Sequence, residues 1–523
     1  MTYNLRIRLL LFLLLVGFFL AGLVILPVPF TRDQGIYAYN AWMWLADSVP
    51  YRDTFGHKGP SLYAVYAVAL DMSAGAFWGV NLFDLLSRTA TVLFTFLLAR
   101  DLFGKRAGLY ASFFAALPLF GIFNSCWWNG QAETFMIPLI TASAWLCVRR
   151  PETGGNFLCL LSGFLMGQAC AMKTNAVFIA VFLFFWLMIY GGERGVSPKR
   201  GLCYLAGGIM AALLWAAYFL GKGALYELYE CLFLFNSFHL ESALSLSGPG
   251  PALVFGRGLT VFSGLVLFLV FFPLRRGEAK GSMAFAVFFL LFALASVAIQ
   301  LRFFLYHFLL VIPAMAIATG RGADVIHEWL NSLRFRAALV FVVLVVGLSL
   351  FHYGKSWYLI TLSYRTFDYI GGRIERAGYY SRFSEDNKEG VGDFNLLATA
   401  AVSSYIREHT DEDAEVLVFG YEPLVNYLSG RPAPTRFEID YPLTFQPLSE
   451  RAEETRQRWR SQFMTELQNR PPRFVVLVDN DLNAIEMETS KVQAAMFEQF
   501  WTWLNKNYEK SDTIEDFSFY EKR

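Results

Sequence analysis

TRDQGIYAY at residues 31–39 and PYRDTFGHKGP at residues 50–60 hold the largest group of charged side chains in the first two-thirds of the chain. An apolar run from about residue 9 to 28 precedes them, and Arg6 and Arg8 stand before that run. About 20 apolar residues can cross a bilayer as a helix, and basic residues mark the cytoplasmic end of such a helix. The sequence therefore predicts an uncleaved first membrane span that leads to a loop on the outer side of the membrane.

The composition also indicates a membrane protein. The chain has 523 residues, of which 55% are hydrophobic and 17% charged, and its mean hydropathy is +0.40. Soluble domains carry about 25% charged residues. The net charge of +1 offers no basic face for a nucleic acid. The six cysteines are scattered without the C-x-x-C spacing of a metal site.

Apolar runs of spanning length recur along the first 353 residues and predict about eleven membrane helices. They lie near residues 7–29, 78–100, 107–124, 134–148, 156–172, 175–191, 202–220, 253–273, 282–300, 304–320 and 336–353. Alternate connections between them are rich in Arg and Lys, for example at 100–106, 149–150, 194–200 and 275–280. This alternation predicts a cytoplasmic N-terminus and, for an odd number of spans, an outer location for everything after about residue 354. We expect a multi-pass protein of the bacterial plasma membrane.

Residues 354–523 have a soluble composition. Strand-like runs at 415–420 and 473–479 alternate with helical patterns at 396–408 and about 448–469. Short apolar strands alternating with helices indicate an α/β layer domain. The predicted fold class is thus mainly α, a polytopic membrane domain of residues 1–353 followed by a small extracytoplasmic α/β domain in 354–523.

The outer loop at about residues 30–77 contains two further helical patterns. Tyr37, Trp42, Trp44 and Leu45 define one amphipathic helix, and a second apolar face follows at 62–70. Such helices lie in the membrane interface, with aromatic rings at the level of the lipid headgroups. This arrangement would hold Asp33 near the bilayer surface. The alternative is that Asp33 is an ordinary N-cap of the helix at 34–47.

Several other charged residues map to the outer side under this topology, and each has two interpretations. Lys58 could bind a phosphate or extend to lipid headgroups. Lys173 is the sole cation between two spans and could serve a ligand or a structural ion pair. Glu133 opens a span, where it could also stabilise the helix dipole. Arg302 and His307 lie at another outer edge.

Asp84 and Arg88 have the i, i+4 spacing of an ion pair within one helix. For Arg88, as for the outer-side residues, the bland interpretation and the functional one both stay open. The coincidence of so many charges on one predicted side of the membrane carries more weight than any single motif.

The stretches at 31–39 and 50–60, together with Glu133 at the start of a span, resemble the GT-C membrane glycosyltransferases. The similarity is greatest to the branch of protein O-mannosyltransferases and the lipid A aminoarabinose transferase. The resemblance implies an inverting transfer of a sugar from a polyprenyl-phosphate donor to a glycan, lipid or protein acceptor on the outer side. It implies Asp33 as the catalytic base, and as substrate-binding residues Arg32, Tyr37, Lys58, Arg88, Glu133, Lys173, Arg302 and His307.

The chain departs from that family at two positions. Gln34 stands where the family often has Glu, which leaves one carboxylate at this point and argues against a metal site there. Gly59 stands where the family has Pro, which predicts a looser turn around Lys58. The pattern assigns no metal ligand and no cofactor, and leaves room for a divalent metal.

Two other function classes compete with a transferase. A transporter or flippase of a lipid-linked substrate would also place charges in the membrane, but it should show broken spans and internal repeats. Neither feature is evident in the sequence. A non-catalytic assembly protein would use its outer domain to bind a partner.

Overall fold

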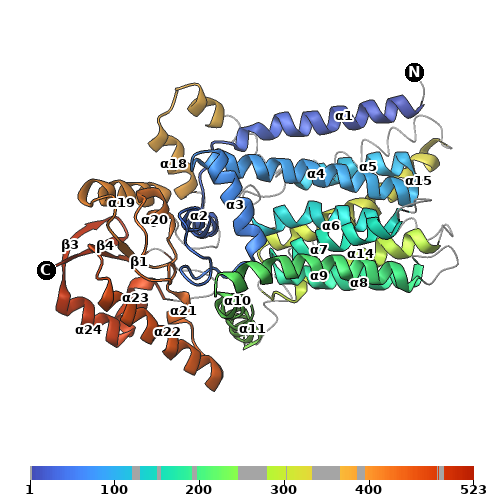
Figure 1. The fold of residues 1–523 in the computed structure, drawn as a ribbon. Coiled ribbons are helices and arrows are strands. Elements are labelled where there is room, and N and C mark those ends of the chain that lie inside the picture. The colour runs from blue at the N-terminus through green and yellow to red at the C-terminus, as the bar shows by residue number, and fades with distance from the viewer. Residues whose placement is uncertain are drawn as a thin grey trace. The chain divides into compact units, whose positions relative to one another are not determined.

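Figure 1 shows the protein as a computed structural model. The structure describes residues 3–119, 130–149, 155–190, 197–245, 280–301, 303–331, 365–385, 395–479, 481 and 488–523. The predicted spans near 253–273 and 336–353 lie outside the described residues, as does Arg302. The chain divides into two compact units: residues 1–26, 81–216 and 247–364 form the first, and residues 27–80, 217–246 and 365–523 form the second.

The first unit is a bundle of apolar helices that run alongside one another (Figure 1). The predicted spans within the described residues each fall on a helix. These helices are α1 (Tyr3–Gly22), α4 (Phe77–Phe103), α5 (Lys105–Leu119), α6 (Ala132–Val148), α7 (Gly155–Cys170), α8 (Val177–Tyr190), α9 (Pro198–Gly221), α14 (Lys280–Ala298) and α15 (Ile312–Asn331). In the described part of the chain, five helical segments are long and apolar enough to cross a membrane. The protein is a multi-pass membrane protein.

Helix α15 continues past residue 320, where hydropathy alone predicted its end. Ion pairs account for the extension. Arg321 pairs with Asp324 one turn later at 2.5 Å, and Arg106 of α5 pairs with both Asp324 and Glu328. Charges that end an apolar run can therefore still belong to the helix when a neighbouring helix supplies their partners.

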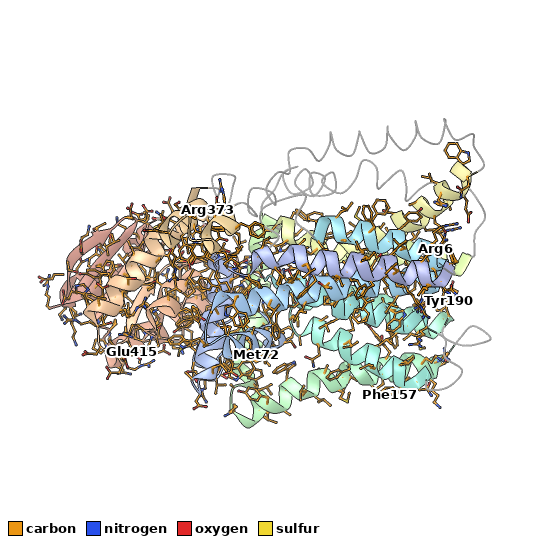
Figure 2. All side chains as sticks on the ribbon, turned by 90° about the horizontal axis from the view of Figure 1, so that it is seen from above. Arg6, Met72, Phe157, Tyr190, Arg373 and Glu415 are labelled. Atoms are coloured by element: carbon orange, nitrogen blue, oxygen red, sulfur yellow. The ribbon has the colours of Figure 1, made fainter. Side chains whose placement is uncertain are left out.

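Basic residues gather at one end of this helical bundle. Arg6, Phe157 and Tyr190 lie toward that same end (Figure 2). Lys105 donates a hydrogen bond to Asn4 there at 2.8 Å. Arg6 and Lys105 thus come from parts of the chain about 100 residues apart and lie at the same end of the bundle as the start of α7 and the end of α8.

Helices α7 and α9 pack closely through glycines. A Cβ atom on Gly207 of α9 would collide with the backbone of α7 at Leu160 and would lie 2.7 Å from the amide nitrogen of Phe164. A Cβ atom on Gly163 would likewise collide with the backbone at Tyr204. Small residues let membrane helices approach each other to backbone contact, where dispersion forces hold them together.

We expect Gly207→Ala to lower the stability of the protein by about 1–3 kcal/mol, because the added methyl group forces the two backbones apart. Thermal unfolding in detergent would measure the change. Gly17→Ala in α1 is the matched control, since no described atom lies within 4 Å of the Cβ position there and the gain in helix propensity is the same. Equal unfolding midpoints for the two variants would show that the close approach of α7 and α9 contributes nothing.

The second unit combines the outer loop with the C-terminal part of the chain. Its helices are α2 (Arg32–Leu45), α3 (Pro60–Met72), α10 (Leu225–Tyr229), a π-helical turn (Glu230–Leu234), α11 (Phe235–Ser245), α18 (Arg376–Glu385), α19 (Leu396–His409), α20 (Leu424–Ser429), α21 (Tyr441–Thr444), α22 (Glu450–Asn469), α23 (Ser490–Met496) and α24 (Glu498–Asn507). The two helices predicted in the outer loop therefore form, as α2 and α3.

A four-stranded sheet lies within this unit. Its strands are β1 (Val416–Phe419), β2 (Phe474–Val478), β3 (Tyr508–Ile514) and β4 (Phe517–Lys522), in the order β1-β2-β4-β3. Strands β1 and β2 are parallel and fully buried, and α19 covers one face of the sheet with Val402 and Ile406. The two strands and the helices α19 and α22 match the sequence predictions. The hairpin of β3 and β4 was not predicted.

Candidate functional site

The helix that carries Asp33 begins one residue before it. Thr31 is the N-cap of α2, and Gln34 completes a capping box: its Oε1 atom accepts a hydrogen bond from the Thr31 amide at 3.2 Å and another from the Thr31 hydroxyl. Asp33 is the acidic residue of the first turn and is partly exposed. The interpretation of Asp33 as an N-cap is therefore wrong, because Thr31 and Gln34 cap the helix.

Arg32 ties the same turn to the C-terminal part of the unit. Its Nε atom lies 3.0 Å from Oε2 of Glu422, whose side chain is fully buried. Glu422 also accepts a hydrogen bond from the Thr399 hydroxyl at 3.2 Å. Burial raises the pKa of Glu422 to about 6, and the Arg32 guanidinium opposes that shift. Arg32 was predicted to bind substrate, and in the structure one of its partners is the carboxylate of Glu422. Its role in substrate binding stays a prediction.

Two tyrosines hold the backbone at Lys58. The hydroxyl of Tyr51 donates to the Lys58 carbonyl at 2.8 Å, and the Lys58 amide donates to the hydroxyl of Tyr63 at 3.1 Å. Gly59 then caps α3, which begins with Pro60. The glycine that replaces the family's proline sits in an extended conformation, and the tyrosines fix the turn on its N-terminal side.

A second buried carboxylate joins α2 to the loop before Lys58. Glu438 accepts hydrogen bonds from the side-chain amide of Asn40 at 2.8 Å and from the backbone amide of Phe55 at 2.6 Å. Asn40 in turn accepts from the Thr54 hydroxyl at 2.6 Å. Burial raises the pKa of Glu438 to about 7, against the lowering effect of these hydrogen bonds.

The first unit brings three of the predicted site residues together. Lys173, in the connection between α7 and α8, lies 2.5 Å from Oε1 of Glu133, which is the second residue of α6. Nε2 of His307 lies 4.0 Å from the same oxygen, and the Lys173 ammonium lies 5.8 Å from the ring centre of Tyr306. Glu133 is buried, and its Oε2 atom has no hydrogen-bond partner among the described residues.

Arg88 lies buried in α4, where it forms the predicted pair with Asp84 at 2.8 Å. Both side chains are fully buried, and Arg88 also donates to the Leu119 carbonyl at 3.2 Å. Tyr37 is buried too, with its ring edge-on to Tyr66 at 5.5 Å. Roles in substrate binding for Arg88 and Tyr37 stay predictions.

A metal ion has no evident set of ligands in the described part of the chain. No three His, Cys, Asp or Glu side chains group closely enough there to hold one. Asp33 has Gln34 beside it rather than a second carboxylate. We assign no step to a metal ion.

Comparisons with known proteins show what the chain and its fold are similar to. Residues 57–219 match the family of dolichyl-phosphate-mannose-protein mannosyltransferases. No curated protein matches by sequence. The fold matches ArnT from Cupriavidus metallidurans bound to undecaprenyl phosphate, with a TM-score of 0.57 and 12% identity over 99% of this chain and 98% of that one. It also matches the Archaeoglobus fulgidus oligosaccharyltransferase tethered to an acceptor peptide, with a TM-score of 0.52 and 13% identity over 98% of this chain and 74% of that one. The chain therefore shares the fold of these two membrane proteins.

The resemblance to GT-C enzymes seen in the sequence is thus confirmed. Sequence reasoning missed Glu422 and Glu438, the two buried carboxylates that bind side chains of the Asp33 helix. Each lies about 400 residues along the chain from its partner. The only local signal is an acidic residue within a largely apolar stretch, and that signal does not identify a partner.

We expect Arg32→Gln to destabilise the protein by on the order of 3 kcal/mol at pH 8, because it leaves the buried Glu422 carboxylate unpaired. The pKa of Glu422 in the folded state is already raised and would rise further without Arg32, so its ionised form opposes folding. The stability that protonated Glu422 contributes is fully present below its ordinary pKa of about 4.5. It is lost as the pH rises through the raised pKa of the folded protein. The loss in Arg32→Gln should therefore be smaller at pH 5 than at pH 8.

Chemical denaturation in detergent at the two pH values would measure this difference. Arg373→Gln is the control, since Arg373 is 77% exposed and its pair with Asp368 should contribute less than about 1 kcal/mol at either pH. A loss in Arg32→Gln that is independent of pH would contradict the assignment of Glu422 as the affected partner.

Proposed function

We propose that this protein is an inverting glycosyltransferase that moves a sugar from a polyprenyl-phosphate donor to an acceptor on the outer side of the membrane. The observation that carries the proposal is the placement of Asp33 in the first turn of α2. Thr31 and Gln34 cap that helix, and Arg32 anchors it to Glu422, so the partly exposed Asp33 stands on a turn that is fixed from both sides. The match of residues 57–219 to a mannosyltransferase family supports the reaction class.

Asp33 is the catalytic base in this proposal. A sugar, lipid or protein hydroxyl is a poor nucleophile, and a positioned carboxylate that accepts its proton assists the attack. The hydroxyl oxygen forms a bond to the anomeric carbon as the bond from that carbon to the phosphate oxygen breaks. Attack on the face opposite the leaving phosphate inverts the anomeric configuration.

Lys173 and His307 bind the lipid phosphate in this proposal, with Lys58 and Arg302 as further cations. Fixed positive charge stabilises a phosphate that gains negative charge as it leaves. Glu133 pairs with the same ammonium at 2.5 Å. An ammonium has three N–H donors, so it can pair with Glu133 and bind a phosphate as well. The ion pair and the phosphate site are therefore compatible interpretations of Lys173.

We further propose that the basic end of the helical bundle faces the cytoplasm. Arg6 and Lys105 belong to that end, and an excess of Lys and Arg marks cytoplasmic connections in membrane proteins. Glu133 begins α6, whose other end leads into the basic connection at Arg149. Glu133 and Lys173 would then lie toward the outer surface, where a lipid-linked donor presents its sugar.

We expect Asp33→Asn to reduce transfer by about 10²–10⁴-fold, because the amide cannot accept a proton. The cost to stability should stay within about 0.3–1 kcal/mol, the effect of one first-turn charge on a helix. The assay would use purified protein, a panel of undecaprenyl-phosphate sugars and a membrane extract as acceptor, with release of undecaprenyl phosphate as the readout.

Asp47→Asn is the matched control for Asp33. Asp47 follows the other end of α2, is exposed, and has a positive φ of 64° that Asn tolerates well. Its replacement should leave transfer unchanged. An Asp33→Asn protein that transfers sugar at the wild-type rate would refute Asp33 as the base while leaving the fold assignment intact.

The phosphate role of Lys173 predicts that removing the negative charge of its ion pair with Glu133 and removing the whole pair have different effects on phosphate binding. Glu133→Gln removes a negative charge and keeps the cation, so undecaprenyl phosphate should bind at least as tightly as to the wild type. The double variant Lys173→Gln/Glu133→Gln removes the pair without leaving a buried charge, and binding should weaken about 10- to 150-fold. Titration of each protein with undecaprenyl phosphate would test this. Equal affinities of the two variants would return Lys173 to a structural role.

A further inference from the structure

The segment from Ala433 to Glu438 contacts both parts of the outer loop that bear proposed catalytic groups. On the side of α2, the Ala433 amide donates to the hydroxyl of Tyr39 at 2.9 Å, and Glu438 accepts from Asn40. On the side of the loop before Lys58, the ring of Phe437 stacks on Phe55 at 5.4 Å. The segment therefore contacts α2 and the loop at the same time.

Glu438 is the residue of this segment that hydrogen-bonds to both sides. Its Oε1 atom accepts from Asn40 and its Oε2 atom accepts from the Phe55 amide. Its side chain is 1% exposed, so water cannot replace either bond. Two donors converge on one buried group, and a carboxylate is the side chain that offers an acceptor oxygen to each of them.

Both contacts lie close in sequence to the proposed catalytic groups. Asn40 is two turns from Asp33 on the same helix, about 10 Å along its axis, and a helix of that length transmits position rigidly. Phe55 precedes Lys58 by three residues, and Tyr51 and Tyr63 fix the Lys58 backbone. A shift of Phe55 relative to Asn40 is therefore a shift of Lys58 relative to Asp33.

We propose that Glu438 is a positioning residue for transfer, which fixes the Asp33 helix and the Lys58 loop against each other through its two carboxylate oxygens. This inference rests on the proposed function, because it presumes that Asp33 and Lys58 act in one reaction. Glu438 touches neither donor nor acceptor in this role.

The geometry separates this role from ordinary core packing. Apolar contacts hold the loop by themselves: Phe55 packs against Phe235, Phe437 and Trp459, and the Arg436 guanidinium lies 5.1 Å from its ring centre. None of these rings belongs to α2, which Glu438 reaches through Asn40. Dispersion contacts between rings are weakly directional, whereas hydrogen bonds of 2.6 and 2.8 Å fix distance and angle.

The test is Glu438→Gln, which keeps size and burial but offers one acceptor where two donors point. Hydrogen exchange by mass spectrometry, with fragmentation that resolves Phe55, reports the contact directly. Protection of the Phe55 amide should fall about tenfold or more when its acceptor is lost or shared. The rate constant kcat should fall about 10²-fold through misplacement of the reacting groups, with a smaller change in the donor KM.

Glu415→Gln is the matched control, because Glu415 precedes β1 and pairs with the exposed Arg470 rather than with the outer loop. It should change neither the Phe55 exchange nor kcat. Thermal unfolding of both variants should be measured as well. If both unfold only above the assay temperature, the measured kcat values describe folded protein. A merely structural Glu438 would lower its midpoint and leave kcat per folded molecule unchanged.

Two failures are distinguishable. A wild-type protein that transfers no sugar from any donor of the panel refutes the proposed function, and with it a positioning role in transfer. Wild-type transfer together with unchanged kcat or unchanged Phe55 exchange in Glu438→Gln refutes the positioning role alone, and Asp33 keeps its assignment.

Discussion

Two buried carboxylates from the C-terminal part of the chain hold the outer loop in place. Glu422 receives Arg32 from the first turn of α2, and Glu438 receives Asn40 and the Phe55 amide. A buried carboxylate is costly unless hydrogen-bond donors surround it, and here the donors come from the loop. The loop and the C-terminal segment therefore stabilise each other. Without the loop, the carboxylates of Glu422 and Glu438 would lose these hydrogen-bond donors.

This dependence explains why the outer loop groups with residues 365–523 in one compact unit. The sequence suggests a boundary near residue 353, because composition changes there. Composition indicates which part of the chain lies in the membrane and which part in water, whereas the contacts of Glu422 and Glu438 show which segments pack together. The predicted domains 1–353 and 354–523 therefore stay a prediction about membrane and soluble parts, and the two compact units describe packing.

Local patterns in the sequence were sufficient for most helices and for two strands. Apolar length predicts α4 and α14, and short apolar runs predict β1 and β2, because burial leaves a direct mark on hydrophobicity. Strand β3 escaped prediction since its residues alternate poorly and are mostly exposed, as an edge strand allows. The end of α15 at Asn331 was missed for another reason: the charged residues of its last turns pair with Arg106 on α5, and hydropathy does not register such pairs.

The candidate site was predictable only where its residues are close in sequence or unusual in context. Asp33 and Lys173 stand out as charges beside apolar spans, and Asp84 and Arg88 pair at a spacing that any helix provides. The pair of Glu133 and Lys173 joins α6 to the connection between α7 and α8, and nothing in either local pattern specifies the partner. Long-range pairing of this kind depends on how helices pack, which single-sequence periodicity does not encode.

The two departures from the family pattern acquire a physical meaning in the structure. Gln34 uses its side-chain oxygen to cap α2, so the residue beside Asp33 serves the backbone and leaves Asp33 as the acidic residue of that turn. Gly59 leaves Lys58 without a neighbouring proline, and hydrogen bonds from Tyr51 and to Tyr63 fix the backbone instead. In both cases a neighbouring residue shapes the backbone beside the side chain proposed for chemistry. The proposed base has to accept one proton, for which a single carboxylate is sufficient, and Asp33 stands on a turn that Arg32 anchors to Glu422.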